Sequence, residues 1–356
     1  MQRITTGMIA ALACAVSLHA QEVVVPGPGI DDQASVIRST DDGARMVVFE
    51  RLDEDSLSGD LWLTRSLDDG ATWSEPVAII ASVSNERHPA LLQLGPHDYV
   101  LFYLKGAGSS TSFRLWRATS TDGISFAEQN QLDLGWTSGG EVNPHVILHA
   151  DGTLTMSYQR LPMDSAGSYV AESTDGGATW DTQKSQIASN ALLPRLAYRE
   201  SDGLYLASYQ VNPGNEALKM YTKTTTDPHD WSAPPHDFEV TGNNHDSLPV
   251  VMPDDAFVLF WSRGSAPPLG QFDIAVRRSL NGIDWSPALT VTESPTMLDV
   301  EPHPLLGAST SRVELYWGRE PLDAFDYDIV REPSVVVNDM IFADAFEAIG
   351  IGRLSR

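Results

Sequence analysis

The sequence has 356 residues, of which 48 are acidic and 23 are basic, so its formal net charge is −25 at pH 7. This charge argues against a polyanionic partner, and we expect neither nucleic acid nor an anionic membrane to bind. The length would allow two domains. The single cysteine, Cys14, excludes an internal disulfide, so stability must come from the core.

Residues 1–20 have the pattern of a secretory signal peptide. Arg3 supplies the early positive charge, residues 9–18 form an apolar core, and residues 17–20 form a small-residue cleavage site. The apolar run is too short to span a bilayer, so we expect no membrane insertion. The pattern predicts a secreted or periplasmic protein whose mature chain has no cysteine, because Cys14 lies in the leader.

One short motif recurs along the rest of the chain. Residues 66–73 read Ser-Leu-Asp-Asp-Gly-Ala-Thr-Trp, and residues 173–180 nearly repeat them. Degenerate copies occupy residues 120–126, 225–231 and 279–285. The closing aromatic residues are 53, 54, 51 and 54 residues apart. So constant a period indicates one supersecondary unit repeated in a single ring.

The motif suits a tight turn. A hydroxyl and a carboxylate two residues apart can bind the backbone N–H groups of the turn, and glycine permits a positive φ. The aromatic residue then covers the turn. We therefore assign a structural role to these positions: Ser66, Asp68, Gly70, Trp73, Asp122, Asp175, Trp180, Asp227, Trp231 and Trp285.

The segments between the motifs predict the rest of each unit. Each repeat contains a strand usually opened by proline, a tight turn, a second apolar strand, a loop, a third strand, the motif and a fourth strand. Six such units predict an all-β fold, a six-bladed β-propeller of four-stranded antiparallel blades, over residues 22–337. The outer strand of the last blade, which closes the ring, is formed either by residues 22–25 or by residues 334–337. Residues 338–356 form an appended C-terminal tail.

The pattern Ser-x-Asp-x-Gly-x-Thr-Trp is the Asp-box, also called the BNR repeat, and six blades carrying it resemble the sialidase (neuraminidase) superfamily. The resemblance implies a glycan-directed exo-glycosidase that binds with three arginines and uses a tyrosine nucleophile assisted by a glutamate, with an aspartate as acid/base. The sequence departs from this pattern. Gln33, Ala34 and Ser35 replace the Arg-Ile-Pro motif, and Tyr316 falls inside a strand of the last blade. These departures argue against sialidase activity itself.

Topology predicts where a ligand would bind. The Asp-boxes share one face of the ring with the turns between the first and second strands. The starts of the first strands and the ends of the second strands meet on the opposite face, around the channel. Two columns of charge lie there, the acids Asp32, Glu86, Glu141, Asp246 and Asp299 and the bases Arg51, Lys105, Arg160, Arg263 and Arg319. They form either salt bridges within each blade or a polar funnel for a substrate.

Residues that break the sixfold pattern are the better candidates for binding. Trp136 could stack on a sugar ring, and three of the arginines could form a triad. The candidate substrate-binding residues are Arg87, His88, Trp136, Asn143, His145, Arg195, His245, Arg263, His303 and Arg319.

A glycosidase needs two carboxylates about 5 to 9 Å apart across the scissile bond. We predict Glu141 and Asp246 for these roles, with Glu301 in reserve. A carboxylate ring could also hold Ca²⁺, but no Asp-x-Asp-x-Asp loop supports it, so we expect no metal and no cofactor. The alternative is a carbohydrate-binding or scaffold propeller without turnover. In either case we expect a monomer whose partner is a glycan or glycoconjugate.

Overall fold

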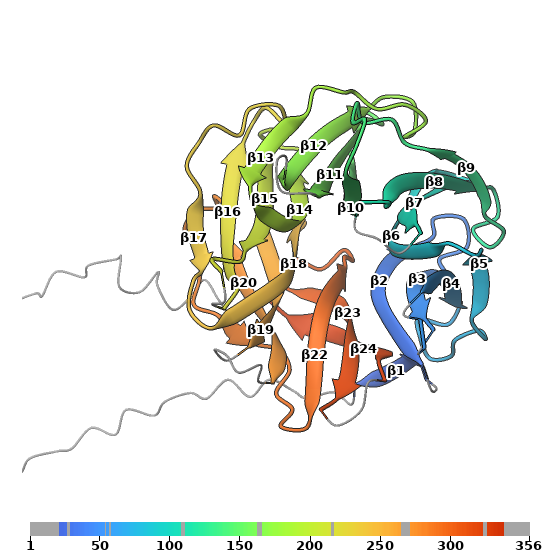
Figure 1. Ribbon diagram of the computed structural model, residues 1–356. Coiled ribbons are helices and arrows are strands. Elements are labelled where there is room, and N and C mark those ends of the chain that lie inside the picture. The colour runs from blue at the N-terminus through green and yellow to red at the C-terminus, as the bar shows by residue number, and fades with distance from the viewer. Residues whose placement is uncertain are drawn as a thin grey trace, which may run out of the picture.

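The computed structural model describes residues 21–26, 29–53, 55–56, 58–107, 111–161, 166–214, 217–264, 271–322 and 326–337. In this part of the chain, 24 strands form six four-stranded antiparallel sheets, and there is no helix. Figure 1 shows these sheets as blades around a central axis. The predicted six-bladed propeller is confirmed. The expected signal peptide (1–20) and tail (338–356) lie outside the described residues and stay predictions.

The strands run outward from the channel in chain order. The innermost strands are β2 (Ile30–Arg38), β6 (Asn85–Gly95), β10 (Gly140–Leu148), β14 (Ala191–Arg199), β18 (Asn243–Val251) and β22 (Met297–Leu305). The second strands are β3 (Arg45–Leu52), β7 (Asp98–Gly106), β11 (Leu154–Leu161), β15 (Leu204–Val211), β19 (Phe257–Gly264) and β23 (Arg312–Pro321). The third strands are β4 (Gly59–Ser66), β8 (Arg114–Ser120), β12 (Gly167–Ser173), β16 (Lys219–Thr225), β20 (Phe272–Ser279) and β24 (Asp328–Val336). The outer strands are β5 (Val77–Ile80), β9 (Ala127–Gln131), β13 (Ser185–Ser189), β17 (His236–Glu239), β21 (Leu289–Thr290) and β1 (Glu22–Val25).

The ring closes through the N-terminal strand. β1 pairs with β24, so blade 6 consists of β22, β23, β24 and β1, while blades 1 to 5 are continuous in sequence. Figure 1 shows this blue strand beside the red one. Val24 and Val25 are buried, and Glu22 Oε2 accepts a 2.6 Å hydrogen bond from Arg331 Nε. Of the two predicted closures, residues 22–25 are therefore the ones used.

The core lies between neighbouring blades. The second strands are covered on both faces and read as nearly continuous apolar runs, as expected for buried strands. Each has a fully enclosed aromatic residue near its end, and these are Phe49, Tyr103, Tyr158, Tyr209, Trp261 and Trp317. The clusters join adjacent blades, since Phe102 of blade 2 packs with Val142 and Met156 of blade 3. Blade-to-blade packing therefore fixes the positions of the innermost strands.

The Asp-box of blade 1 shows how these turns are built. Ser66 Oγ accepts the Gly70 N–H at 2.7 Å, and Asp68 Oδ1 accepts the Thr72 N–H at 2.9 Å. Blade 3 repeats both bonds through Ser173 and Asp175. The tryptophan then packs on the preceding blade: Trp73 meets Tyr316 edge-on with ring centroids 6.2 Å apart.

The Asp-boxes lie on the same face as the turns between the first two strands. Arg65, just before the box of blade 1, donates a 2.6 Å hydrogen bond to Asp42 in such a turn. We call this side the lock face and the opposite side, where the innermost strands begin, the mouth face. None of the described residues forms a helix long and apolar enough to cross a membrane.

Candidate functional site

Every innermost strand contains a β-bulge at the same place, where two residues lie opposite one residue of the second strand, and the first of the two is the bulge residue. In all six blades this residue has a positive φ, between 47° and 57°. The six residues, here called the bulge ring, are Gln33, His88, Asn143, Leu193, Asp246 and Glu301. None is glycine, so the surrounding structure must hold each in a sparsely populated conformation. Such strain concentrates at functional sites.

The second strand of the preceding blade supports most of the ring. Glu50 Oε2 accepts the backbone N–H of His88 at 2.9 Å, and Gln210 Oε1 accepts that of Asp246 at 3.0 Å. The same arrangement joins Gln159 to Leu193 and Ser262 to Glu301. The side chain that follows the buried aromatic residue of the second strand therefore fixes a bulge in the next blade.

Glu301 joins blade 6 to blade 1. Its Oε2 atom accepts the Gln33 N–H at 3.0 Å, and its Oε1 atom accepts a hydrogen bond from the Gln33 side-chain amide. Burial raises the pKa of Glu301 well above its usual value, and the charge of Asp32 adds to this effect. Burial also raises the pKa of Asp32 to about 6, although its hydrogen bond with Glu301 acts the other way. The two carboxyl groups therefore hold a shared proton well above pH 4.5.

Asp246 has the opposite electrostatic environment. Its carboxylate contacts His245 Nδ1 and also interacts with Arg195. Burial alone would raise the pKa of Asp246, but the His245 charge and hydrogen bond, together with the Arg195 charge, keep this pKa below its usual value. The same pairing raises the pKa of His245, against the effect of its burial. Asp246 is therefore ionised where Glu301 is protonated.

A fourth carboxylate, Glu50, binds Arg87. Nε and Nη2 of Arg87 donate to Glu50 Oε1 at 3.0 and 2.6 Å. Burial would raise the pKa of Glu50, but Arg87 and the His88 backbone N–H bring it below the usual value. His88 itself stays neutral, because burial lowers its pKa to about 4. Asp32, Glu50, Asp246 and Glu301 together form what we call the central cluster.

The two predicted charge columns are salt bridges in four blades. Arg51 pairs with Asp31 at 2.6 Å, Lys105 with Glu86 at 3.3 Å, Arg160 with Glu141 at 3.6 Å and Arg319 with Asp299 at 2.6 Å. Two predicted members were wrong. Asp31, and not Asp32, lies opposite Arg51, while Asn244, and not Asp246, lies opposite Arg263. Arg263 is instead 3.9 Å from Glu239 and is 42% exposed.

Glu141 lies apart from the central cluster. It is buried against Arg160, and burial raises its pKa to about 7 although Arg114 and Arg160 oppose the shift. Arg160 also lies over the Trp136 ring, 4.1 Å from its centroid, and Lys184 lies 4.6 Å from the same centroid. A sugar would have to displace one of these cations to stack on Trp136. The structure therefore brings Asp246 and Glu301 to the bulge ring and places Glu141 elsewhere.

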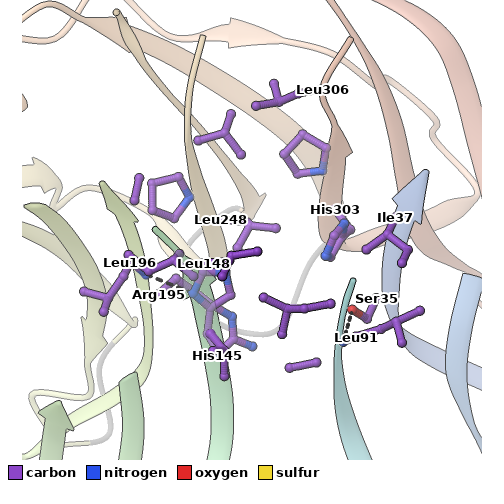
Figure 2. A pocket seen from close by; sticks show the side chains of 18 of the residues that line it. Ser35, Ile37, Leu91, His145, Leu148, Arg195, Leu196, Leu248, His303 and Leu306 are labelled. Atoms are coloured by element: carbon purple, nitrogen blue, oxygen red, sulfur yellow. Dashed lines mark hydrogen bonds between the residues drawn. The ribbon is translucent and has the colours of Figure 1, made fainter. Parts of the chain in front are cut away.

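The other predicted binding residues divide between the ring and the channel. Asn143 is in the ring and donates to Gln159 Oε1 at 2.8 Å. His145, Arg195 and His303 lie just beyond the bulges, in a cavity on the channel side of the ring, and Figure 2 shows His303 across from Arg195 and His145. Among the described residues, no group of three or more His, Cys, Asp or Glu side chains is arranged to hold a metal ion.

Sequence reasoning missed several members of the site: Gln33, Glu50, Gln159, Leu193, Gln210 and Ser262. Four of these, Glu50, Gln159, Gln210 and Ser262, are support residues, which accept the backbone N–H of a bulge residue, and Leu193 is a ring residue. Both kinds of residue occupy regular sequence positions. Each support residue comes directly after the buried aromatic residue of its second strand, and each ring residue comes just before the proline or its equivalent. Prolines mark that position in blades 2, 3, 4 and 6, but Ala34 and Ser247 occupy it in blades 1 and 5. In blade 5 the proline, Pro249, comes two residues after this position. Counting from it therefore placed Asp246, and not Asn244, opposite Arg263.

Comparison with known proteins identifies the family. Residues 42–328 match the family model described as a BNR repeat-like domain. The chain belongs to this family. A search of curated protein sequences found no match.

Solved structures of this fold include glycoside hydrolases. The NanB sialidase of Streptococcus pneumoniae aligns with a TM-score of 0.69 at 10% identity, over 90% of this chain and 71% of that one. The GH93 α-L-arabinofuranosidase of Fusarium graminearum, solved with arabinobiose, aligns with a TM-score of 0.68 at 13% identity, over 90% and 97%. A Dyadobacter fermentans protein of unknown function aligns with a TM-score of 0.67 at 14% identity, over 88% of this chain and 97% of that one. At these identities the likeness shows the fold, which confirms the sialidase-like propeller expected from the Asp-boxes.

Proposed function

We propose that this BNR-repeat propeller is a glycoside hydrolase whose active site is the central cluster. The observation that carries the proposal is the placement of two carboxyl groups in opposite environments on neighbouring blades of the bulge ring: Asp246 contacts His245, whereas Glu301 binds neutral Gln33 near Asp32. These environments raise the pKa of Glu301 and lower that of Asp246. A protonated acid beside an ionised carboxylate is the pair that glycoside hydrolysis requires.

Each group has a distinct role in the reaction. Glu301, sharing its proton with Asp32, donates a proton to the glycosidic oxygen as the bond to the sugar breaks. Asp246, kept ionised by His245 and Arg195, acts on the opposite face of the sugar as nucleophile or as base for a water molecule. The bulge ring holds both side chains at the channel through backbone hydrogen bonds to Gln210 and Ser262.

The fixed charges favour a neutral sugar over a sialoside. Arg87 donates two hydrogen bonds to Glu50, and Arg51 and Arg319 are held in salt bridges of 2.6 Å. A sugar carboxylate would have to compete with internal acids for each of these three arginines, and with Asp246 for the charge of Arg195. The arabinofuranosidase among the structural neighbours makes α-L-arabinofuranosides a first substrate to try.

A hydrolysis screen tests the proposal. Purified protein is incubated with 4-methylumbelliferyl glycosides, including the α-L-arabinofuranoside and the sialoside, and with natural oligosaccharides. We expect a neutral glycoside to be cleaved, and Asp246→Asn to lower the rate at least 100-fold. Release of sialic acid alone would overturn the neutral-sugar assignment, and absence of any product with any glycan would count against hydrolysis.

A carbohydrate-binding propeller without turnover is the second candidate. The self-satisfied pairs Arg51–Asp31 and Arg319–Asp299, together with the Glu50–Arg87 pair, favour it. Binding on a glycan array without any product in the screen would support this candidate. Turnover that depends on Glu301 would eliminate it.

We also propose that the protein is exported and works as a monomer. The leader pattern of residues 1–20 supports export. N-terminal sequencing of protein from the periplasm or culture medium tests the cleavage, and a mature chain that still begins at Met1 would contradict it. Light scattering of the purified protein tests the monomer.

A further inference from the structure

The channel contains a cavity that begins at the bulge ring, where Gln33, His88, Asp246 and Glu301 line it. Its volume is about 570 Å³, within the usual range for small-molecule sites. From the ring it extends toward the lock face, because the rest of its wall comes from the later halves of the innermost strands. Most of the wall is aliphatic, with side chains such as Ile37, Leu92, Leu148, Val250 and Leu306. Leu148 and Leu306, near its opening, are 39% and 36% exposed.

One cation lies at the inner end of this cavity. Arg195 Nη1 donates to the Pro194 carbonyl at 3.1 Å. Within the described part of the chain, no Asp or Glu forms a salt bridge with Arg195, whereas most arginines near the channel have such a partner. A guanidinium has five N–H donors, so most of its donor capacity faces the cavity. The charges of Asp246 and Glu301 offset part of the cost of burying this cation, but its unpaired N–H donors stay costly unless an acceptor satisfies them.

Two histidines extend this polar end. His145 Nδ1 accepts the Leu196 N–H at 3.2 Å, so the neutral ring carries its proton on Nε2 and can donate. His303 Nδ1 is buried and has no hydrogen-bond partner among the described residues. Burial and the Arg195 charge lower the pKa of both rings, so neither adds a positive charge at neutral pH. This end of the cavity therefore holds the Arg195 guanidinium with two neutral histidines beside it (Figure 2), and the Asp246 and Glu301 carboxyl groups belong to the same lining.

We propose that this cavity binds an amphipathic monocarboxylate, with the carboxylate on Arg195 and the apolar chain against the aliphatic wall. A carboxylate matches the planar fork of a guanidinium. A single negative charge matches the single guanidinium, whereas a dianion such as phosphate would meet about twice the repulsion from the ionised Asp246 nearby. The cavity shares Asp246 and Glu301 with the proposed active site, but the proposal needs only binding at Arg195 and holds whether or not a glycoside is hydrolysed.

Calorimetric titration with straight-chain acids tests the proposal. Acetate, butyrate and hexanoate are titrated into the purified protein at pH 7, with hexan-1-ol and hexylamine as neutral and cationic matches for hexanoate. We expect affinity to rise roughly threefold to fourfold for each added methylene. Hexanoate should bind at least tenfold more tightly than hexan-1-ol or hexylamine. Equal binding of the three six-carbon compounds, or affinity independent of chain length, would overturn the proposal.

Two substitutions at Arg195, with a surface arginine as control, test whether hexanoate binds in the cavity or on the surface. Arg195→Gln should weaken hexanoate binding at least tenfold, while Arg195→Lys, which keeps the charge, should weaken it less. The matched control is Arg312→Gln, because Arg312 is an exposed cation that bonds Ser334 at the edge of blade 6. Unchanged binding by Arg195→Gln would contradict the assignment. If that variant does not fold, the comparison of the three six-carbon compounds on the natural sequence still decides the question.

Discussion

The Oε2 atom of Glu301 accepts a hydrogen bond of 3.0 Å from the backbone N–H of Gln33. This bond joins the bulges of the last and first blades, next to the strands that close the ring. The same carboxyl group is the proposed proton donor. A substitution at Glu301 can therefore act on the ring as well as on the chemistry, and the glutamine variant is preferable because its side chain keeps an acceptor for Gln33.

Activity should have a defined dependence on pH. The proposed mechanism needs Asp246 ionised and Glu301 protonated. Because the pKa of Asp246 lies below its usual value and that of Glu301 lies well above, kcat/KM should be constant across mildly acidic pH. It should fall at high pH as Glu301 loses its proton. A profile that instead rises from acidic to alkaline pH would contradict these roles.

Asp32→Asn should move the alkaline limb of that profile to lower pH. After burial, the charge of Asp32 is the largest cause of the raised pKa of Glu301, and the substitution removes it. The measurement is kcat/KM from pH 4 to 9 for both proteins. Asp31→Asn is the matched control, since Asp31 is the neighbouring carboxylate that pairs with Arg51. An alkaline limb that stays in place in Asp32→Asn would show that Asp32 does not influence the acid.

The Asp-boxes should make stability sensitive to acid. Hydrogen bonds from Thr72 hold the pKa of Asp68 at about 2, and those from Thr179 do the same for Asp175, whereas the ordinary value is 3.8. Because these pKa values are lowered in the folded state, their stabilising effect is complete above about pH 4 and is lost as the pH falls toward 2.

Urea unfolding between pH 5 and 2.5 measures this effect. Asp175→Asn should be less stable than the natural protein at pH 5, and the difference should shrink as the pH approaches 2. A constant difference across this range would contradict the linkage. Glycoside turnover by the folded variant should be unchanged, because Asp175 lies on the lock face.

Two glycines allow a matched test of the lock geometry. Gly177 has a φ of +78°, and a Cβ atom there would lie 2.3 Å from Phe102 Cζ in the preceding blade. Gly152 has a φ of +89° but open space around the same position. Gly152→Ala should lower the free energy of unfolding by about 1–2 kcal/mol from backbone strain alone.

Gly177→Ala should cost about 2–4 kcal/mol, since overpacking adds to the same strain. Urea denaturation of the two variants gives the comparison. Equal losses would mean that the contact of the turn with Phe102 relaxes without cost.

The repeated motif predicted the fold because each copy depends only on contacts among a few neighbouring residues. Serine, aspartate, glycine and tryptophan at fixed offsets make the same turn in any blade, so their period revealed the propeller. No comparable sequence motif identifies the residues of the bulge ring. Gln33, Leu193 and Glu301 have poor preference for positive φ, and only packing between blades holds them there. Counting from prolines failed in blades 1 and 5, where none occupies the expected position. This placed Asp32 and Asp246 in the column of salt-bridge acids, although Asp246 was also predicted as a catalytic carboxylate.

The most direct test of the central claim compares two glutamates in one assay. The kcat/KM of Glu301→Gln and of Glu141→Gln is measured on the best glycoside found in the screen. A central-cluster active site predicts a loss of at least 100-fold for Glu301→Gln and a change within about threefold for Glu141→Gln. The reverse order, or full activity of Glu301→Gln, would contradict it.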